Sequence, residues 1–542
     1  MCRNVNAWRG NGRGGFLTAL KQKVVLFGAS GTMGYEVFKE LWKRRETIDI
    51  ILLLLPARRE KKLFAAYEKR AGIKALPEHR VAAGNGLKIV WGDATHYPDV
   101  AEAIRGADWV LNAMAFISPA ADYYPEMAKA VNTTAVQNIV DAIQAEPNGA
   151  ARIRLVHTST VAATGDRPPP IHWGRVGDPL KPSIFDFYAV TKIAGERIVL
   201  ESQIKHWAVL RMTFIMPTHF SALMRLRDPI MFHMPIHACM ENITSADAGY
   251  GMANVLDIPD NSDFWRRVYN MGGGPGMRIP AADYQNLAVQ LLGLSGIQAV
   301  SERRWFALRN FHMQYYHDSW EANQYLHYWR TDMESYKRKL LASMPAALKL
   351  VRLVNHHIDS FRHLIEKFVY GILKGLAAEH RNGPLHWYVG RNDARITAFY
   401  KNYAAFEAIP GWNVDMPDTD PHRPALMLNH GYDEEKPRLE LADLQQAAKF
   451  RGGTCLATGW DGSLYNKLAW RCARGHSFSA MPYTILKAGH WCPDCMPPAW
   501  NYDEEARLNP FFAQVWYPNH EVSENNVYPA ECVLDIAGAD KD

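Results

Sequence analysis

The stretch Lys23-Val-Val-Leu-Phe-Gly28-Ala-Ser-Gly31-Thr-Met-Gly34 joins a short apolar run to a glycine-rich turn. An amphipathic segment at 33–44 follows at once, so the order is strand, turn, helix. Gly28 permits the tight reversal, Gly31 lets the backbone approach a phosphate, and Gly34 lets the helix pack close to the sheet. The turn therefore predicts that a dinucleotide pyrophosphate binds at a helix N-terminus, where N–H groups and the helix dipole favour an anion.

Apolar runs and amphipathic segments keep alternating over the first three hundred residues. We expect strands at 23–28, 49–55, 87–92, 108–113, 152–158 and 207–214. Helical patterns lie between them at 33–44, 100–105, 125–144 and 188–201. This repetition predicts an α/β protein with a doubly wound parallel sheet of Rossmann type.

The length of 542 residues is too great for one ordinary core, so several domains are expected. We expect a flexible leader at 1–22, a Rossmann domain at 23–330 whose smaller substrate lobe is mainly 214–330, a helical region and linker at 331–445, a metal ribbon at 446–500, and a tail at 501–542. The longest unbroken apolar run, 50–55, is far too short to span a bilayer, and the leader has no signal-peptide core. We therefore expect a cytoplasmic protein.

A second segment, Tyr188-Ala-Val-Thr-Lys192, places a phenol and an ammonium one helical turn apart. A cation at i+4 favours the phenolate, so we expect the pKa of Tyr188 to fall below its ordinary value of about 10. Tyr188 could then take a proton from an alcohol or give one to a carbonyl. Thr160 is expected to orient the substrate oxygen, and Ser159 remains its alternative.

The glycine turn and the Tyr188–Lys192 pair together resemble the extended short-chain dehydrogenase/reductase family, which includes nucleotide-sugar epimerases. The resemblance covers about 23–274. It implies a catalytic set of Tyr188, Lys192 and Thr160, with Asn132 bracing the active site and Lys192 also bonding the nicotinamide ribose. It implies cofactor contacts from Gly28, Ser30, Gly31, Thr32, Met33, Gly34, Asp93, Ala113, Met114, Ala115 and Pro217, besides Tyr188 and Lys192.

The end of the second expected strand bears on which nicotinamide nucleotide binds. It reads Leu54-Leu-Pro-Ala-Arg58-Arg59-Glu-Lys-Lys62, without the strand-end carboxylate that bonds the ribose of NAD. Guanidinium groups suit a 2′-phosphate, so Arg58 and Arg59 predict NADP, with NAD less favoured. The alternative is an exposed basic loop.

The residues after Thr160 limit the reaction. Sugar dehydratases of the family carry an Asp-Glu pair there, whereas this chain has Val161-Ala162-Ala163. We therefore expect redox between a ketone or aldehyde and an alcohol, by a Thr-Tyr-Lys triad. An epimerase acting through a transient ketone on a nucleotide-sugar-like substrate is one alternative, and a non-catalytic NADP(H) sensor with a ribbon as its interaction arm is another. We also expect a homo-oligomer.

Two later segments leave alternatives open. The ring-rich stretch from Trp305 to Trp329 fits either an apolar or aromatic substrate pocket or ordinary helix packing. The stretch 336–377 is helical, apolar and basic, with a break expected near Ser343 because of Pro345. It could make a peripheral contact with anionic lipid or pack against the protein.

A cysteine and histidine cluster lies near the C-terminus. Cys472 and His476 precede the knuckle Cys492-Pro-Asp-Cys495, and this spacing predicts a tetrahedral, structural zinc site. Cys455 remains an alternative to His476 as the fourth ligand. The arrangement resembles small zinc-ribbon modules. A nucleic-acid partner is not expected, because the local charge is mixed.

Overall fold

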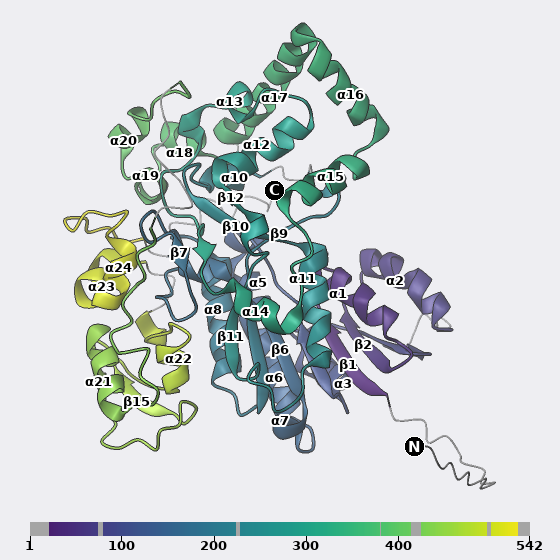
Figure 1. The fold of residues 1–542 in the computed structure, drawn as a ribbon, viewed down its shortest axis with the longest axis vertical. Coiled ribbons are helices and arrows are strands. Elements are labelled where there is room, and N and C mark those ends of the chain that lie inside the picture. The colour runs from purple at the N-terminus through teal and green to yellow at the C-terminus, as the bar shows by residue number, and fades with distance from the viewer. Residues whose placement is uncertain are drawn as a thin grey trace, which may run out of the picture.

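The computed structural model describes residues 21–73, 80–223, 228–379, 381–413, 424–495 and 500–528. Its centre is an eight-stranded sheet in the order β11-β8-β6-β5-β1-β2-β4-β3, with only the β3–β4 pair antiparallel (Figure 1). The strands are β1 Gln22–Phe27, β2 Ile48–Leu54, β3 Val81–Gly84, β4 Leu87–Trp91, β5 Trp109–Asn112, β6 Arg154–Thr160, β8 His206–Met212 and β11 Arg267–Met271.

Helices cover both faces of this sheet. One face packs against α1 Thr32–Lys43, α2 Arg58–Arg70, α11 Ser245–Asn254 and α14 Ser319–Leu326. The other packs against α3 Tyr97–Ile104, α6 Ala135–Ala145 and α8 Phe187–Leu200. The nearly continuous apolar strands are explained by this burial on both faces. The predicted Rossmann-type α/β fold is confirmed.

Some elements differ from their predicted limits. The segment 207–214 divides at Thr213, where β8 ends and β9 Phe214–Met216 leaves to join β10 Cys239–Thr244 and β12 Arg278–Pro280 in a small second sheet. Strand β6 continues past the apolar run to Thr160 because its last residues pair with β8; they are buried although they are polar. The helix predicted at 125–144 is interrupted by a π-helical turn, Ala130–Thr134.

A helical region extends from the top of the body in Figure 1. It comprises α15 Met333–Ser343, α16 Ala346–His357 and α17 Asp359–Glu379, so the break predicted near Ser343 is confirmed. A second break at Ile358, which was not predicted, turns α16 and α17 into a hairpin. In the described part of the chain no helix is both long and apolar enough to cross a membrane.

Most of the ring-rich stretch is buried, although Trp320 is 51% exposed. Trp305, Tyr315, Tyr316 and Tyr328 are each at most 2% exposed. Tyr328 belongs to the core on one face of the central sheet. These four rings therefore stabilise the fold.

The C-terminal part packs directly beside the central sheet (Figure 1). It contains α21 Leu441–Phe450, a three-stranded antiparallel sheet of β14 Thr454–Cys455, β15 Leu468–Arg471 and β16 Ser477–Ala480, and α22 Pro482–Leu486. The Tyr483 hydroxyl accepts a hydrogen bond of 2.9 Å from the backbone N–H of Val268 in β11. Its ring contacts that of Trp207 at 5.7 Å, so this part shares a core with the sheet.

Candidate functional site

The glycine turn leads from β1 into the start of α1. Gly28 has a φ of +78°, and a Cβ there would lie 2.7 Å from the backbone of Met114. A Cβ on Gly34 would lie 2.0 Å from the carbonyl oxygen of Gly28. Only glycine fits these two positions, so the strand, the turn and the helix can approach as closely as they do.

The N-terminus of α1 fits an anionic group. Gly31 and Thr32 are exposed there, and within the described residues no side chain caps the helix. The first-turn amides are therefore open to an outside acceptor. The Met33 side chain is buried in the core, so its contribution to such a site would be its backbone amide.

The other predicted cofactor residues follow the carboxyl ends of three strands, of which β4 and β5 are in the central sheet and β9 is in the second sheet. Ala113, Met114 and Ala115 come directly after β5, which pairs with β1. Asp93 is exposed after β4, and Pro217 follows β9. In the central parallel sheet, the ends of β4 and β5 border the crevice in which ligands of this fold bind.

The two arginines lie at the start of α2, next to the glycine turn. Both are exposed, and Nη2 of Arg59 donates to the carbonyl oxygen of Ser30 at 3.1 Å. Arg59 is thereby held beside the turn, at the side where the second strand ends.

Asn132 lies in the π-helical turn and is buried. Its Oδ1 accepts from the N–H of Phe116 at 2.8 Å, and its Nδ2 donates to the carbonyl of Phe116 at 2.9 Å. Nδ2 also lies 3.1 Å from Oγ1 of Thr191 in α8. The side chain therefore links the segment after β5 to the helix that carries Tyr188 and Lys192.

Tyr188 and Thr160 are brought together. Asp186 caps α8, and Tyr188 stands half-buried in its first turn. Burial raises the pKa of Tyr188 to about 12, Asp186 adds to the rise, and a hydrogen bond with Thr160 lowers it. Ser159 makes no side-chain hydrogen bond among the described residues, so the contact favours Thr160 as the partner of the phenol.

Lys192 is buried one turn further along α8. Its Nζ donates to the carbonyl oxygen of Thr158 at 2.5 Å. Burial lowers the pKa of Lys192 to about 7, and the carboxylate of Glu196 partly opposes that fall. The expected lowering of the pKa of Tyr188 is therefore wrong for the protein without a bound nucleotide. Burial disfavours the charged form of both groups: it raises the pKa of the phenol and lowers the pKa of the ammonium.

A third residue of the same helix face, Glu196, was missed by the sequence reasoning. Its carboxylate accepts from Arg211 at 2.6 Å and 3.1 Å, and Nε2 of His490 lies 2.9 Å from it. All three side chains are at most 2% exposed. Its position four residues after Lys192 was the available signal, but its partner His490 is 294 residues away in sequence.

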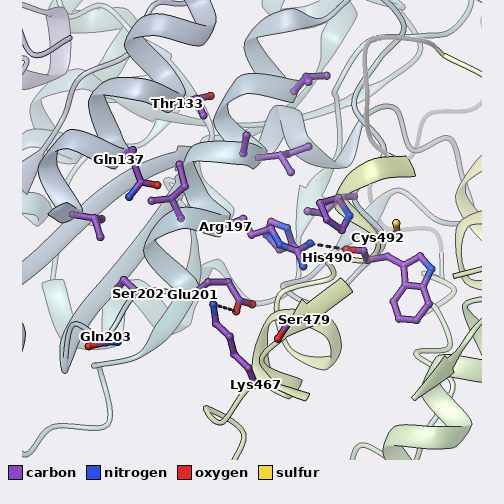
Figure 2. A pocket seen from close by; sticks show the side chains of 18 of the residues that line it. Thr133, Gln137, Arg197, Glu201, Ser202, Gln203, Lys467, Ser479, His490 and Cys492 are labelled. Carbon is purple, nitrogen blue, oxygen red and sulfur yellow. Dashed lines mark hydrogen bonds and ion pairs between the residues drawn. The ribbon is translucent and has the colours of Figure 1, made fainter. Parts of the chain in front are cut away.

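A groove of about 640 Å³ lies between α6, α8 and the C-terminal part (Figure 2). Arg197 donates there to the carbonyl of Trp491 at 2.6 Å, and Lys467 pairs with Glu201 at 3.3 Å. Tyr188, Thr160 and Lys192 do not line it. The groove is thus separate from the candidate active site.

The four predicted metal ligands converge. One ligand atom from each of Cys472, His476, Cys492 and Cys495 lies within 4.8 Å of the others. The Sγ atoms of Cys472 and Cys495 are 3.7 Å apart, and Nδ1 of His476 is 3.4 Å and 3.6 Å from Cys495 and Cys492. A tetrahedral zinc site requires edges of about 3.5–3.8 Å. The residues fit zinc, whereas Cys455 packs in an apolar cluster outside the ligand set.

Residues 24–231 match the model of the NAD dependent epimerase/dehydratase family. Among solved structures, the chain resembles the Bordetella bronchiseptica enzyme WbmG in complex with NAD, at 15% identity, over 60% of this chain and 95% of the other, with a TM-score of 0.42. It also resembles the dTDP-glucose 4,6-dehydratase DesIV from Streptomyces venezuelae, at 16% identity over 59% and 96%, with a TM-score of 0.45. No curated protein matches the chain.

The depressed pKa of Lys192 predicts a pH-dependent contribution to stability. Between about pH 7 and the unfolded value of about 10.4, the unfolded chain binds more protons at this residue, so stability rises with pH there. The slope is at most about 1.4 kcal/mol per pH unit. In thermal unfolding, the melting temperature of the wild type relative to Lys192→Met should rise from pH 7 to pH 9. A difference that stays constant over this range would contradict the assignment.

The metal geometry predicts about one zinc ion per chain, measured by elemental analysis of purified protein. Cys472→Ser or Cys495→Ser should lose the ion and lower the melting temperature. The matched control Cys455→Ser, at a buried cysteine outside the cluster, should keep it. If only Cys455→Ser lost the zinc, Cys455 would be a ligand and the assignment of the four ligands would be wrong.

Proposed function

We propose that the chain, of which residues 24–231 match the model of the NAD dependent epimerase/dehydratase family, is an NADP-dependent oxidoreductase that interconverts a ketone or aldehyde and an alcohol. The observation that supports the proposal is the placement of Tyr188 and Lys192, one turn apart on α8, against the end of β6 that carries Thr160: Nζ of Lys192 donates to the carbonyl oxygen of Thr158 at 2.5 Å. The uncapped glycine turn follows β1 of the same sheet. A bound nicotinamide would supply or accept the hydride.

The residues of the chain would handle the proton. Thr160 holds the phenol and a substrate oxygen at one place, and Tyr188 gives its proton to that oxygen during carbonyl reduction. At neutral pH the phenol of Tyr188 carries the proton that this direction requires, but burial raises its pKa to about 12 and makes it a weaker acid, so a nearby cation has to stabilise the phenolate as the proton leaves. Lys192 would steady the phenolate that forms and bond the ribose, and Asn132 would hold α8 against the segment after β5.

Two alternatives use parts of the same site. An epimerase needs the same triad, with the ketone kept in place between two opposite hydride transfers. A non-catalytic NADP(H) sensor needs the glycine turn but neither Tyr188 nor Lys192, whose presence speaks against it. The missing Asp-Glu pair after Thr160 still argues against dehydration.

The preference for NADP rests on Arg58 and Arg59. Arg59 is fixed to Ser30 beside the glycine turn, and no acidic residue stands between Leu54 and Arg59. Charge-assisted hydrogen bonds to a 2′-phosphate fit this position. Zinc is proposed as structural, because four protein ligands leave no open position for a substrate. The cytoplasmic location, the homo-oligomer and the absence of a nucleic-acid partner stay predictions.

Tyr188→Phe should lower NADPH-dependent turnover of a reactive ketone by about 100-fold or more, because proton transfer to the substrate oxygen is lost. NADPH binding, followed by fluorescence titration, should stay within a few-fold of wild type. The control Tyr517→Phe removes a hydroxyl at the end of a C-terminal helix and should leave turnover unchanged. Full turnover in Tyr188→Phe would contradict the assignment of Tyr188 as the proton donor. If the wild type binds NADPH tightly but reduces no member of a ketone panel, the sensor is favoured.

Arg58→Ala/Arg59→Ala should weaken NADPH binding by roughly 10- to 100-fold, the size expected for lost charge-assisted hydrogen bonds. NADH binding should change little, because NADH carries no 2′-phosphate. Arg70→Ala, at the far end of the same helix, is the control. Equal losses for both nucleotides, or none for either, would contradict the NADP assignment.

A further inference from the structure

The hairpin of α16 and α17 exposes an unusual number of large apolar side chains. Six of them are between 49% and 67% exposed: Leu350, Leu353, Ile358, Leu364, Phe368 and Ile372. Single exposed apolar residues are ordinary, but a group on two adjacent helices indicates a contact surface. Figure 1 shows this hairpin reaching away from the rest of the protein.

The exposed residues form a pattern and are not scattered. Leu364, Phe368 and Ile372 are spaced four residues apart and so share one stripe of α17. A different stripe of α17, which includes Ile365, Val369 and Leu373, packs on a buried cluster of the protein. Helix α17 is thus apolar on two sides, of which the body of the protein covers one.

Positive charge accompanies the uncovered stripe. The hairpin itself, residues 346–379, contains five lysines and arginines against three acidic residues. Two of these acids are engaged: Glu366 is buried and accepts from the N–H of Ser295, and Asp359 pairs with Arg362 at 2.7 Å. Lys349, Lys367 and Lys374 are exposed next to the apolar residues.

We propose that this hairpin docks the protein on the surface of an anionic lipid bilayer. The stripe of Leu364, Phe368 and Ile372 would enter the boundary between headgroups and acyl chains, as amphipathic helices do. The flanking lysines would reach lipid phosphates while their stems stay in the apolar layer. Ile358, at the turn of the hairpin, would enter with them.

Charge favours lipid over a second copy of the chain as the occupant. A symmetric dimer would bring the same basic surface of two protomers together, and like charges across an interface are costly. An anionic bilayer complements that charge. The hairpin would lie on the bilayer without crossing it, because in the described chain no helix has the required length and hydropathy.

The test is co-sedimentation of the full-length protein with vesicles. Phosphatidylcholine vesicles with 30% phosphatidylglycerol should pull down the wild type at low salt, and pure phosphatidylcholine vesicles should do so at least ten-fold less. Added salt should weaken the binding, because the charges are exposed. The assay needs no turnover, so it is independent of the proposed enzymatic function.

Two variants and two controls locate the contact. Phe368→Ser and Lys367→Glu/Lys374→Glu should each weaken binding at least ten-fold. Val389→Ser, which replaces a 78% exposed residue on α18 Pro384–Val389, and Lys69→Glu/Lys449→Glu should leave it unchanged. Wild-type binding in both hairpin variants, or no vesicle binding by the wild type, would overturn the proposal. So would a concentration-dependent dimer that Phe368→Ser dissociates while vesicles bind nothing.

Discussion

The pairing of the buried Glu196 carboxylate with Arg211 and His490 is the interaction on which the packing of α8, β8 and the C-terminal part depends. Arg211 from β8, the next strand along the chain, and His490 from the C-terminal part, 294 residues away in sequence, both reach the carboxylate. A carboxylate without water is tolerated only when it is paired and hydrogen-bonded, and removing one partner of such a pair costs about 3–5 kcal/mol. Burial favours protonation of Glu196, but Arg211 and His490 together hold its pKa well below its usual range.

The same side chain connects two sites that look independent in the sequence. Along α8, Tyr188, Lys192 and Glu196 succeed one another every four residues and share one face. His490 stands two residues before Cys492, one of the four convergent metal ligands. The loop between β6 and α8 is also held by the segment that precedes α21, because Asp178 in this loop lies 3.0 Å from Nε2 of His430. The C-terminal part therefore helps to position the helix of the candidate active site.

Local patterns were sufficient for much of the fold. The strands around the glycine turn, the alternation with helices and the break at Pro345 follow from residues near one another, and the structure has them within a few positions. The four metal ligands also converge as their spacing indicated. What failed depended on distant partners. The pKa of Tyr188 rises with burial, the π-helical turn around Asn132 has no clear sequence signal, and nothing near His490 in the sequence indicates that it is buried at 2% exposure against Glu196.

Hydrogen–deuterium exchange in Glu196→Gln, compared with wild type, tests this account most directly. The substitution keeps the shape of the side chain and removes its charge, so Arg211 is left without its counter-charge in the core. The account predicts faster amide exchange in two places at once, along α8 and in the segment around His490, with the far strands β2 and β4 unchanged. Wild-type exchange at both places would show that the buried carboxylate does not hold the C-terminal part to the helix.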